Sequence, residues 1–182
     1  MTFVDLNPSL KTARTGTHMF FLNGPFSQWH PCAFTATLAG EGTARAFNCA
    51  EQYMMAAKAA LFGDAETLDR IMAVAQQRDW REAPKAHKAL GRLVRGFDPA
   101  AWDAQAREIV FQGNLAKFGQ AENLRKYLQA SGDLILVEGA HYDPIWGVGL
   151  AWDDPRIIDP ANWQGTNWLG EALMRVRAAL AD

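Results

Sequence analysis

Short apolar runs separated by turns fill the first fifty residues, and helical periodicity dominates the rest of the chain. Strands are expected at 18–22, 33–38 and 43–47, and a buried strand at 134–137. Helices bounded by capping residues, glycine or proline are expected at 48–62, from 64 to about 75, from near 84, at 100–118, at 121–130 and at 168–180. This pattern predicts a mainly α (α+β) fold with a few short β-strands.

The first sixteen residues are polar and contain Pro8 and Gly16. We expect an N-terminal arm over residues 1–16, either loose or an irregular cover. No linker or repeat interrupts the chain after this point, so residues 17–182 are expected to form one compact domain.

Composition places the chain among soluble globular proteins, with 49% hydrophobic residues, 21% charged residues and a net charge of −2 over 182 residues. Such a charge gives no overall attraction to nucleic acid. No apolar stretch has the length of a signal peptide or a membrane span, so we expect a cytoplasmic protein without a membrane partner. Two cysteines and four histidines show no metal-binding spacing, and the histidines are assigned to surface or loop roles.

One acid and one base occur seven residues apart in the segment that begins at Asn48. Asn48 and Glu51 have the spacing of a capping pair at a helix start. Seven residues make nearly two helical turns, so Glu51 and Lys58 project from the same side of the predicted helix. They are either site residues or partly solvated edge residues that contribute only to stability.

Four segments occur in a fixed order along the chain. They are Phe26-Ser27-Gln28-Trp29, the helix with Glu51 and Lys58, Lys88-Ala-Leu-Gly-Arg92, and Tyr142-Asp143-Pro-Ile-Trp146-Gly147-Val-Gly followed by Gly-Thr-Asn167-Trp-Leu-Gly. Together they resemble the YbiA-like family, also called NADAR, from about residue 20 to residue 180. Many relatives have Ser-Asn-Phe where Ser27-Gln28-Trp29 stands, and histidine where this chain has Gln52, which does not titrate near neutral pH.

The resemblance implies an N-glycosidase that acts on ribosyl phosphates within a compact helical fold, without a metal or organic cofactor. One implied substrate is an early riboflavin-pathway intermediate, cleaved to ribose 5-phosphate and an aminouracil. Another is ADP-ribosylated guanine, which would make an ADP-ribosylated nucleic acid a partner. The competing interpretation is a non-catalytic module that binds ADP-ribose or NAD derivatives.

Cleavage of a bond between ribose and a base builds positive charge on the sugar, which a carboxylate stabilises. Glu51 is the first catalytic candidate, and the alternative is that it only closes its capping box. Asp143, which precedes Pro144, either positions water or ribose hydroxyls or closes a tight turn. Lys58 binds phosphate, acts as a Schiff-base nucleophile or is simply solvated.

The remaining candidates would bind the substrate. Trp146 with Gly147 suits a base-stacking platform, or is a core tryptophan beside a turn. Lys88 and Arg92 are one helical turn apart and form either a phosphate grip or a surface pair. Asn167 either binds ribose or caps the last helix. The other substrate-binding candidates, supplied by the first motif, are Phe26, Ser27 and Trp29. Lys117 is assigned to a helix end, where the helix dipole favours a cation.

Overall fold

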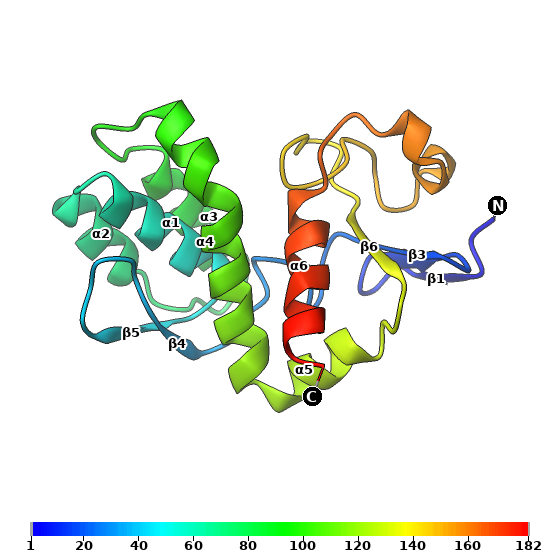
Figure 1. The fold of residues 1–182 in the computed structure, drawn as a ribbon, viewed down its shortest axis with the longest axis horizontal. Coiled ribbons are helices and arrows are strands. Elements are labelled where there is room, and N and C mark those ends of the chain that lie inside the picture. Colours follow the sequence, from blue (N-terminus) through cyan, green and yellow to red (C-terminus); the bar gives the residue numbers. More distant parts are fainter. Residues whose placement is uncertain (1, 182) are drawn as a thin grey trace. The chain divides into compact units, whose positions relative to one another are not determined.

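A computed structural model describes residues 2–181, which contain six α-helices and six β-strands (Figure 1). The α+β class is therefore confirmed. The chain forms two compact units. Unit 1 contains the chain up to Ser27 and from Glu122 onward, and unit 2 contains Gln28–Ala121.

Unit 1 is built on a four-stranded sheet in the order β1-β2-β3-β6. Its strands are β1 (Asp5–Asn7), β2 (Thr12–Arg14), β3 (His18–Phe21) and β6 (Ile135–Glu138). All four residues of β3 are buried, because this strand pairs antiparallel with β2 on one side and parallel with β6 on the other. A parallel pair needs a long connection, and here that connection contains all of unit 2.

Within the irregular arm expected over residues 1–16, residues 5–14 form a regular β-hairpin, so the expectation of an irregular segment was wrong. Strands β1 and β2 pair antiparallel with Asp5 opposite Arg14, and Ala13 of β2 pairs with Phe20 of β3. Ala13 is buried in the same apolar cluster as Phe20. The apolar pattern did not predict strand β2, because only two small residues of this strand, Thr12 and Ala13, are buried.

Helices α5 (Glu122–Gln129) and α6 (Trp168–Ala179) complete unit 1, together with two short 3-10 turns at Pro155–Ile158 and Pro160–Asn162. Helix α6 packs against β6, and the two are drawn in red and yellow in Figure 1. The buried cluster beside the sheet gathers residues from both ends of the chain: Ala13, Phe20, Val137, Val148, Leu150, Trp152 and Ile157.

Unit 2 begins with a two-stranded antiparallel ribbon and continues into its central helix. The ribbon pairs β4 (Phe34–Thr37) with β5 (Ala44–Phe47), as the glycine-containing turn between them predicts. Helix α1 (Ala50–Leu61) follows, and most of its residues are buried because it packs against three other helices.

Those three helices are α2 (Ala65–Met72), α3 (Glu82–Gly91) and α4 (Pro99–Gln120). Asp64 caps α2 as predicted, because its side chain accepts a hydrogen bond from the backbone N–H of Thr67. The third helix ends at Gly91 rather than being interrupted there, and α4 runs one residue past Gly119, where the sequence placed its end.

Two glycines allow neighbouring helices to approach α1 closely. A Cβ atom on Gly91 of α3 would lie 2.0 Å from the sulfur of Met55, and one on Gly113 of α4 would lie 2.4 Å from the ring of Tyr53. The position of α1 therefore depends on the absence of side chains on its neighbours. Within residues 2–181, no helix combines the length and the apolar character needed to cross a membrane.

Candidate functional site

The first turn of α1 is closed by a residue that the capping signature did not indicate. Cys49, not Asn48, is the N-cap, and its side chain makes no capping hydrogen bond. The backbone N–H of Asn48 donates to Oε1 of Gln52 at 2.8 Å, while Nε2 of Gln52 donates to the carbonyl of Ile71 at 3.1 Å. The expected capping box between Asn48 and Glu51 is therefore wrong, and Gln52 performs that function.

The side chain of Asn48 is used elsewhere in unit 2. Its Nδ2 donates to the carbonyl of Val74 at 3.0 Å, and its Oδ1 lies 3.1 Å from Nε2 of His87. His87 is fully buried, as is most of His18 in β3, so the expected surface or loop role was wrong for both. Burial lowers the pKa of His87 to about 4, so this imidazole is neutral and serves as a structural link between α3 and the start of α1.

Glu51 lies in the first turn of α1 and is only 6% exposed. Its backbone N–H donates to the carbonyl of Gln28 at 3.0 Å, and Oε1 of Gln28 accepts a hydrogen bond from Nδ2 of Asn114 at 2.8 Å. These contacts hold the segment after Ser27 between the start of α1 and helix α4. A carboxylate at this end of a helix is favoured by the helix dipole.

A second buried charge of unit 2 lies on α4, and the sequence did not reveal its burial. Lys117 is 0% exposed, although it belongs to the last turn of its helix. Its Nζ lies 5.0 Å from the ring centroid of Phe118. Burial lowers the pKa of this amine to about 8. The sequence signal for such a site is that Lys117, together with Asn114, interrupts the buried face formed by Ala106, Val110 and Gly113.

Two thiols and one imidazole around Lys117 are uncharged at neutral pH. Burial is the main cause that raises the pKa of Cys49 to about 12; the charge of Glu51 raises it further, and that of Lys117 lowers it. Burial also raises the pKa of Cys32, and it lowers the pKa of His30 to about 4 with a contribution from Lys117. Glu51 and Lys117 therefore share one buried neighbourhood with two thiols and an uncharged imidazole.

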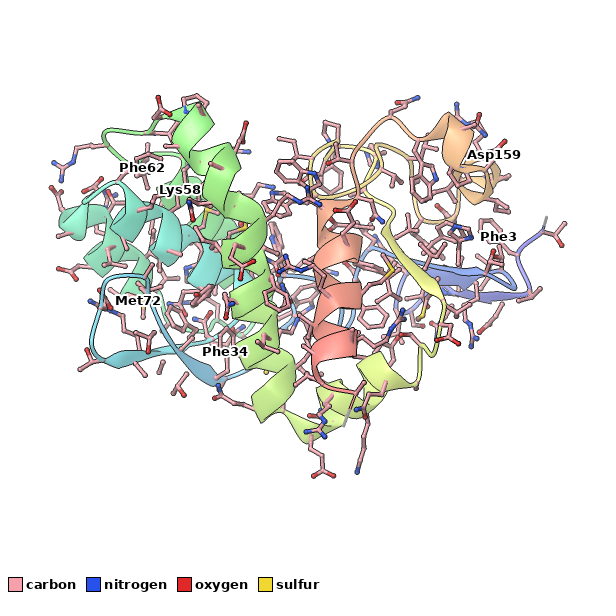
Figure 2. The ribbon with its side chains drawn as sticks, viewed as in Figure 1. Phe3, Phe34, Lys58, Phe62, Met72 and Asp159 are labelled. Atoms are coloured by element: carbon pink, nitrogen blue, oxygen red, sulfur yellow. The ribbon has the colours of Figure 1, made fainter. Side chains whose placement is uncertain are left out.

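Lys58 lies at the other end of α1, about 10 Å along the axis from Glu51 by helix geometry. Its Nζ donates to the carbonyl of Gly91 at 3.0 Å and lies 4.0 Å from the ring centroid of Phe97 and 5.6 Å from that of Trp102. Figure 2 shows Lys58 beside Phe62, which follows one turn later. Burial lowers the pKa of this amine, and the aromatic rings stabilise its charged form.

The other candidates of unit 2 are more accessible. Lys88, in the last turn of α3, is half-buried, and Arg92, immediately after that helix, is exposed. Trp29 is half-buried. Because the side chains of Lys88 and Arg92 reach the solvent, an anion can bind to them.

In unit 1, Asp143 closes a turn with one of its carboxylate oxygens. Its Oδ1 accepts hydrogen bonds from the backbone N–H groups of Ile145 at 3.2 Å and Trp146 at 2.9 Å. Trp146 is half-buried and meets Trp168 edge to face, with ring centroids 5.7 Å apart. The loop therefore holds the carboxylate of Asp143 and the indole of Trp146 in a fixed orientation relative to each other.

The glycine after Trp146 is required by the protein itself. A Cβ atom on Gly147 would lie 2.8 Å from the carbonyl oxygen of Glu138 and 3.0 Å from that of Asp143. The close approach at Gly147 is thus made by other backbone segments of unit 1. The backbone N–H of Gly147 also donates to the carbonyl of Asp143 at 3.2 Å.

Asn167 is the N-cap of α6, but its side chain does not cap the helix. Its Oδ1 accepts from the backbone N–H of Glu138 at 3.0 Å, and its Nδ2 donates to the carbonyl of Leu136 at 2.9 Å. The expected side-chain cap was therefore wrong, because the amide pairs with both backbone groups on the edge of β6. Asn167 adopts the left-handed conformation with φ of 57°, which asparagine tolerates better than most residues.

Two residues of the first motif are buried in unit 1. Phe26 is 1% exposed, and its ring contacts Phe21 and Tyr127 at centroid distances of 5.3 and 5.0 Å. Ser27 is buried, and its backbone N–H donates to the carbonyl of Gly24 at 3.1 Å. Phe26 therefore has the contacts of a core residue.

The fold defined by these elements is that of a known protein. The chain is similar to the NMR structure of the E. coli protein YbiA, with a TM-score of 0.67 over 94% of this chain and 89% of that one, at 24% identity. A family model described as the NADAR domain matches residues 19–181. This chain belongs to the NADAR domain family, as its ordered motifs predicted.

Three curated proteins are also similar to this chain over most of its length. An N-glycosidase of Acanthamoeba polyphaga mimivirus is 42% identical over 84% of this chain and 85% of its own length. An N-glycosidase of Nostoc punctiforme is 32% identical over 72% of this chain and 73% of its own length. The protein irg-1 of Caenorhabditis elegans is 36% identical over 74% of this chain, which spans 61% of that protein.

Proposed function

We propose that this protein is an N-glycosidase that hydrolyses the bond between ribose and a base in ribosyl-phosphate or ADP-ribosyl compounds. The class of reaction is supported by the names of two relatives that match most of the chain. The observation that carries the proposal here is Glu51, a carboxylate that lies in the first turn of α1 and is only 6% exposed.

In the proposed reaction, water adds to C1 of the ribose while the bond from C1 to the base nitrogen breaks. The electron pair of that bond goes to the nitrogen, and the sugar carries positive charge in the transition state. Glu51 stabilises this charge and accepts the proton of the attacking water, which then passes to the departing base. The low exposure of Glu51 strengthens its electrostatic effect, because little water screens it.

The other assigned residues bind and orient the substrate in this proposal. Asp143 positions water or ribose hydroxyls, and its orientation is supported by the two N–H groups that bind its Oδ1. Trp146 stacks against the base, and Lys88 and Arg92 bind phosphate. Of the roles left open for Lys58, the contact with Gly91 and the aromatic rings favours a fixed cation over a free nucleophile.

The substrate class is tested with two compounds in parallel. Purified protein is incubated with the phosphoribosylamino-uracil intermediate of riboflavin synthesis and with an oligonucleotide carrying ADP-ribosylated guanine, and products are followed by mass spectrometry. Release of ribose 5-phosphate from the first identifies a metabolite hydrolase. Release of ADP-ribose from the second identifies a nucleic-acid repair hydrolase.

Glu51→Gln is expected to lower the rate of the active reaction by about 100-fold or more, because the amide neither carries charge nor accepts the proton. Glu122→Gln changes an exposed carboxylate of α5 and is the matched control, expected to retain full activity. Binding of ADP-ribose without release of any base would sink the enzymatic proposal and favour the non-catalytic binding module.

A further inference from the structure

Lys117 has no role in the function described so far, although it is the most buried cation of the described residues. Among residues 2–181, the buried acidic and basic side chains other than histidine are Glu51, Asp64 and Lys117. Asp64 is explained by its contacts, because it caps α2 and its carboxylate binds Arg95 at 2.7 Å. Glu51 and Lys117 are therefore the two buried charges of unit 2 that capping does not explain.

A continuous set of contacts connects these two residues within unit 2. The backbone of Glu51 binds the carbonyl of Gln28, whose side chain binds Asn114 on α4. Lys117 follows Asn114 by three residues and lies on the same face of that helix. Asn114 is itself fully buried and leaves its Oδ1 without a hydrogen-bond partner, so this region is polar inside rather than filled by apolar packing.

The elements packed around Lys117 contribute four other titratable groups. The segment before β4 supplies His30 and Cys32, and the start of α1 supplies Cys49; all three interact electrostatically with Lys117. Glu51 belongs to this set through Cys49, because the charges of Glu51 and Lys117 both act on that thiol. Both thiols are protonated and the imidazole is neutral at neutral pH, for the reasons given above. The neighbourhood thus contains one basic and one acidic side chain, Lys117 and Glu51, among groups that are uncharged at neutral pH.

We propose that Lys117 is a positioning residue of the reaction, whose buried ammonium keeps the carboxylate of Glu51 ionised and fixed in orientation. This inference rests on the proposed function for its effect on turnover. Because Lys117 is 0% exposed, it acts through Glu51 and not by attacking the sugar. A buried positive charge stabilises a neighbouring carboxylate strongly, since protein and not water surrounds both.

The first test does not depend on turnover. The side-chain amine of Lys117 is titrated by NMR with ¹³C at its ε-carbon, in the wild-type chain and in Glu51→Gln. Loss of the neighbouring negative charge disfavours the ammonium, so the titration midpoint is expected to fall by about one pH unit from its wild-type value near 8. Glu122→Gln is the control and should leave the midpoint in place. An unchanged midpoint in Glu51→Gln overturns the proposal even if the protein is an N-glycosidase.

The second test uses the pH profile of kcat/KM on the substrate that is turned over. Activity of the wild-type chain is expected to fall at high pH with a midpoint near 8, as Lys117 loses its proton. In Lys117→Arg this fall should move above about pH 10, because a guanidinium remains protonated. A fall that stays near pH 8 in that variant contradicts the proposal.

Lys117→Met separates charge from packing, because it keeps an unbranched side chain of similar length. We expect kcat to drop by about 30-fold with KM nearly unchanged, and the midpoint of the acidic limb to rise by about one pH unit. Lower activity with an unmoved acidic limb would mean a purely structural role. If either variant fails to fold, as judged by its melting curve, the NMR titration decides alone.

Discussion

Asn48, Glu51 and Gln52 occupy the start of α1, and the residue that closes this turn determines how the Glu51 carboxylate is used. Sequence spacing favours Glu51, because a capping box places the acid three residues after the cap. The structure uses Gln52 instead, because its amide can accept from Asn48 and donate to Ile71 at the same time. A carboxylate has no proton to donate at neutral pH, so Glu51 could not replace both bonds.

Gln52→Ala is expected to lower the free energy of unfolding by about 2 kcal/mol, because it leaves two backbone groups without partners at a site that is 3% exposed. Urea unfolding followed by circular dichroism measures this loss. Gln76→Ala changes an exposed glutamine and should shift stability by less than about 0.5 kcal/mol. Equal effects of the two substitutions would show that the Gln52 contacts contribute little.

At the scale of elements, α6 and β6 are joined by one side chain in addition to apolar packing. Asn167 binds the carbonyl of Leu136 and the N–H of Glu138, so it satisfies an edge of β6 that has no strand beside it. Gly170, one turn into α6, permits this approach, because a Cβ atom there would lie 2.1 Å from the Leu136 oxygen. The motif from residue 165 to residue 170 is therefore explained by packing within unit 1.

Asn167→Asp removes the donor to Leu136 and sets a negative charge beside that carbonyl at a site that is 4% exposed. We expect a loss of about 3 kcal/mol, which corresponds to a melting temperature lower by about 8 °C. Differential scanning calorimetry measures it. Asn123→Asp, in the exposed first turn of α5, should leave the melting temperature unchanged within about 1 °C. A similar melting temperature for both variants would show that the hydrogen bonds of Asn167 to β6 contribute little to stability.

At the scale of the whole molecule, unit 1 is assembled from both ends of the chain. The chain leaves unit 1 after Ser27 and returns at Glu122, and only then does β6 pair with β3. The terminal hairpin belongs to this sheet, since Ala13 and Phe3 both contact its core cluster. Residues 1–16 were expected to be a loose arm or an irregular cover, but strand pairing makes the hairpin of residues 5–14 part of unit 1.

Deletion of residues 2–16 is expected to expose the apolar strand β3 at an unpaired edge. The melting temperature should fall by about 10 °C, and the protein should self-associate in size-exclusion chromatography, because unpaired apolar edges recruit other chains. Val4→Ser is the control, since Val4 is 72% exposed and its replacement removes no buried contact. A truncated chain that stays monomeric with unchanged stability would restore the arm interpretation.

Local sequence predicted the elements that carry strong periodicity or strong caps. The helices that begin after Asp64 and near residue 100, and the strands β3 to β6, lie where the pattern placed them. Ordered motifs also predicted the family, which the match over residues 19–181 confirms. The catalytic and binding assignments to Glu51, Asp143, Lys58 and the motif residues stay predictions until activity is measured.

The sequence by itself determined the helical periods, the turns and the family, because these depend on residues that are close along the chain. Tertiary structure alone decided that Gln52 and not Glu51 closes the first turn of α1, that Asn167 binds β6, and that residues 5–7 and 12–14 form paired strands. It also decided that the amine of Lys117 is enclosed. Hydrogen-bond partners and burial are set by residues distant in sequence, so no local pattern contains them.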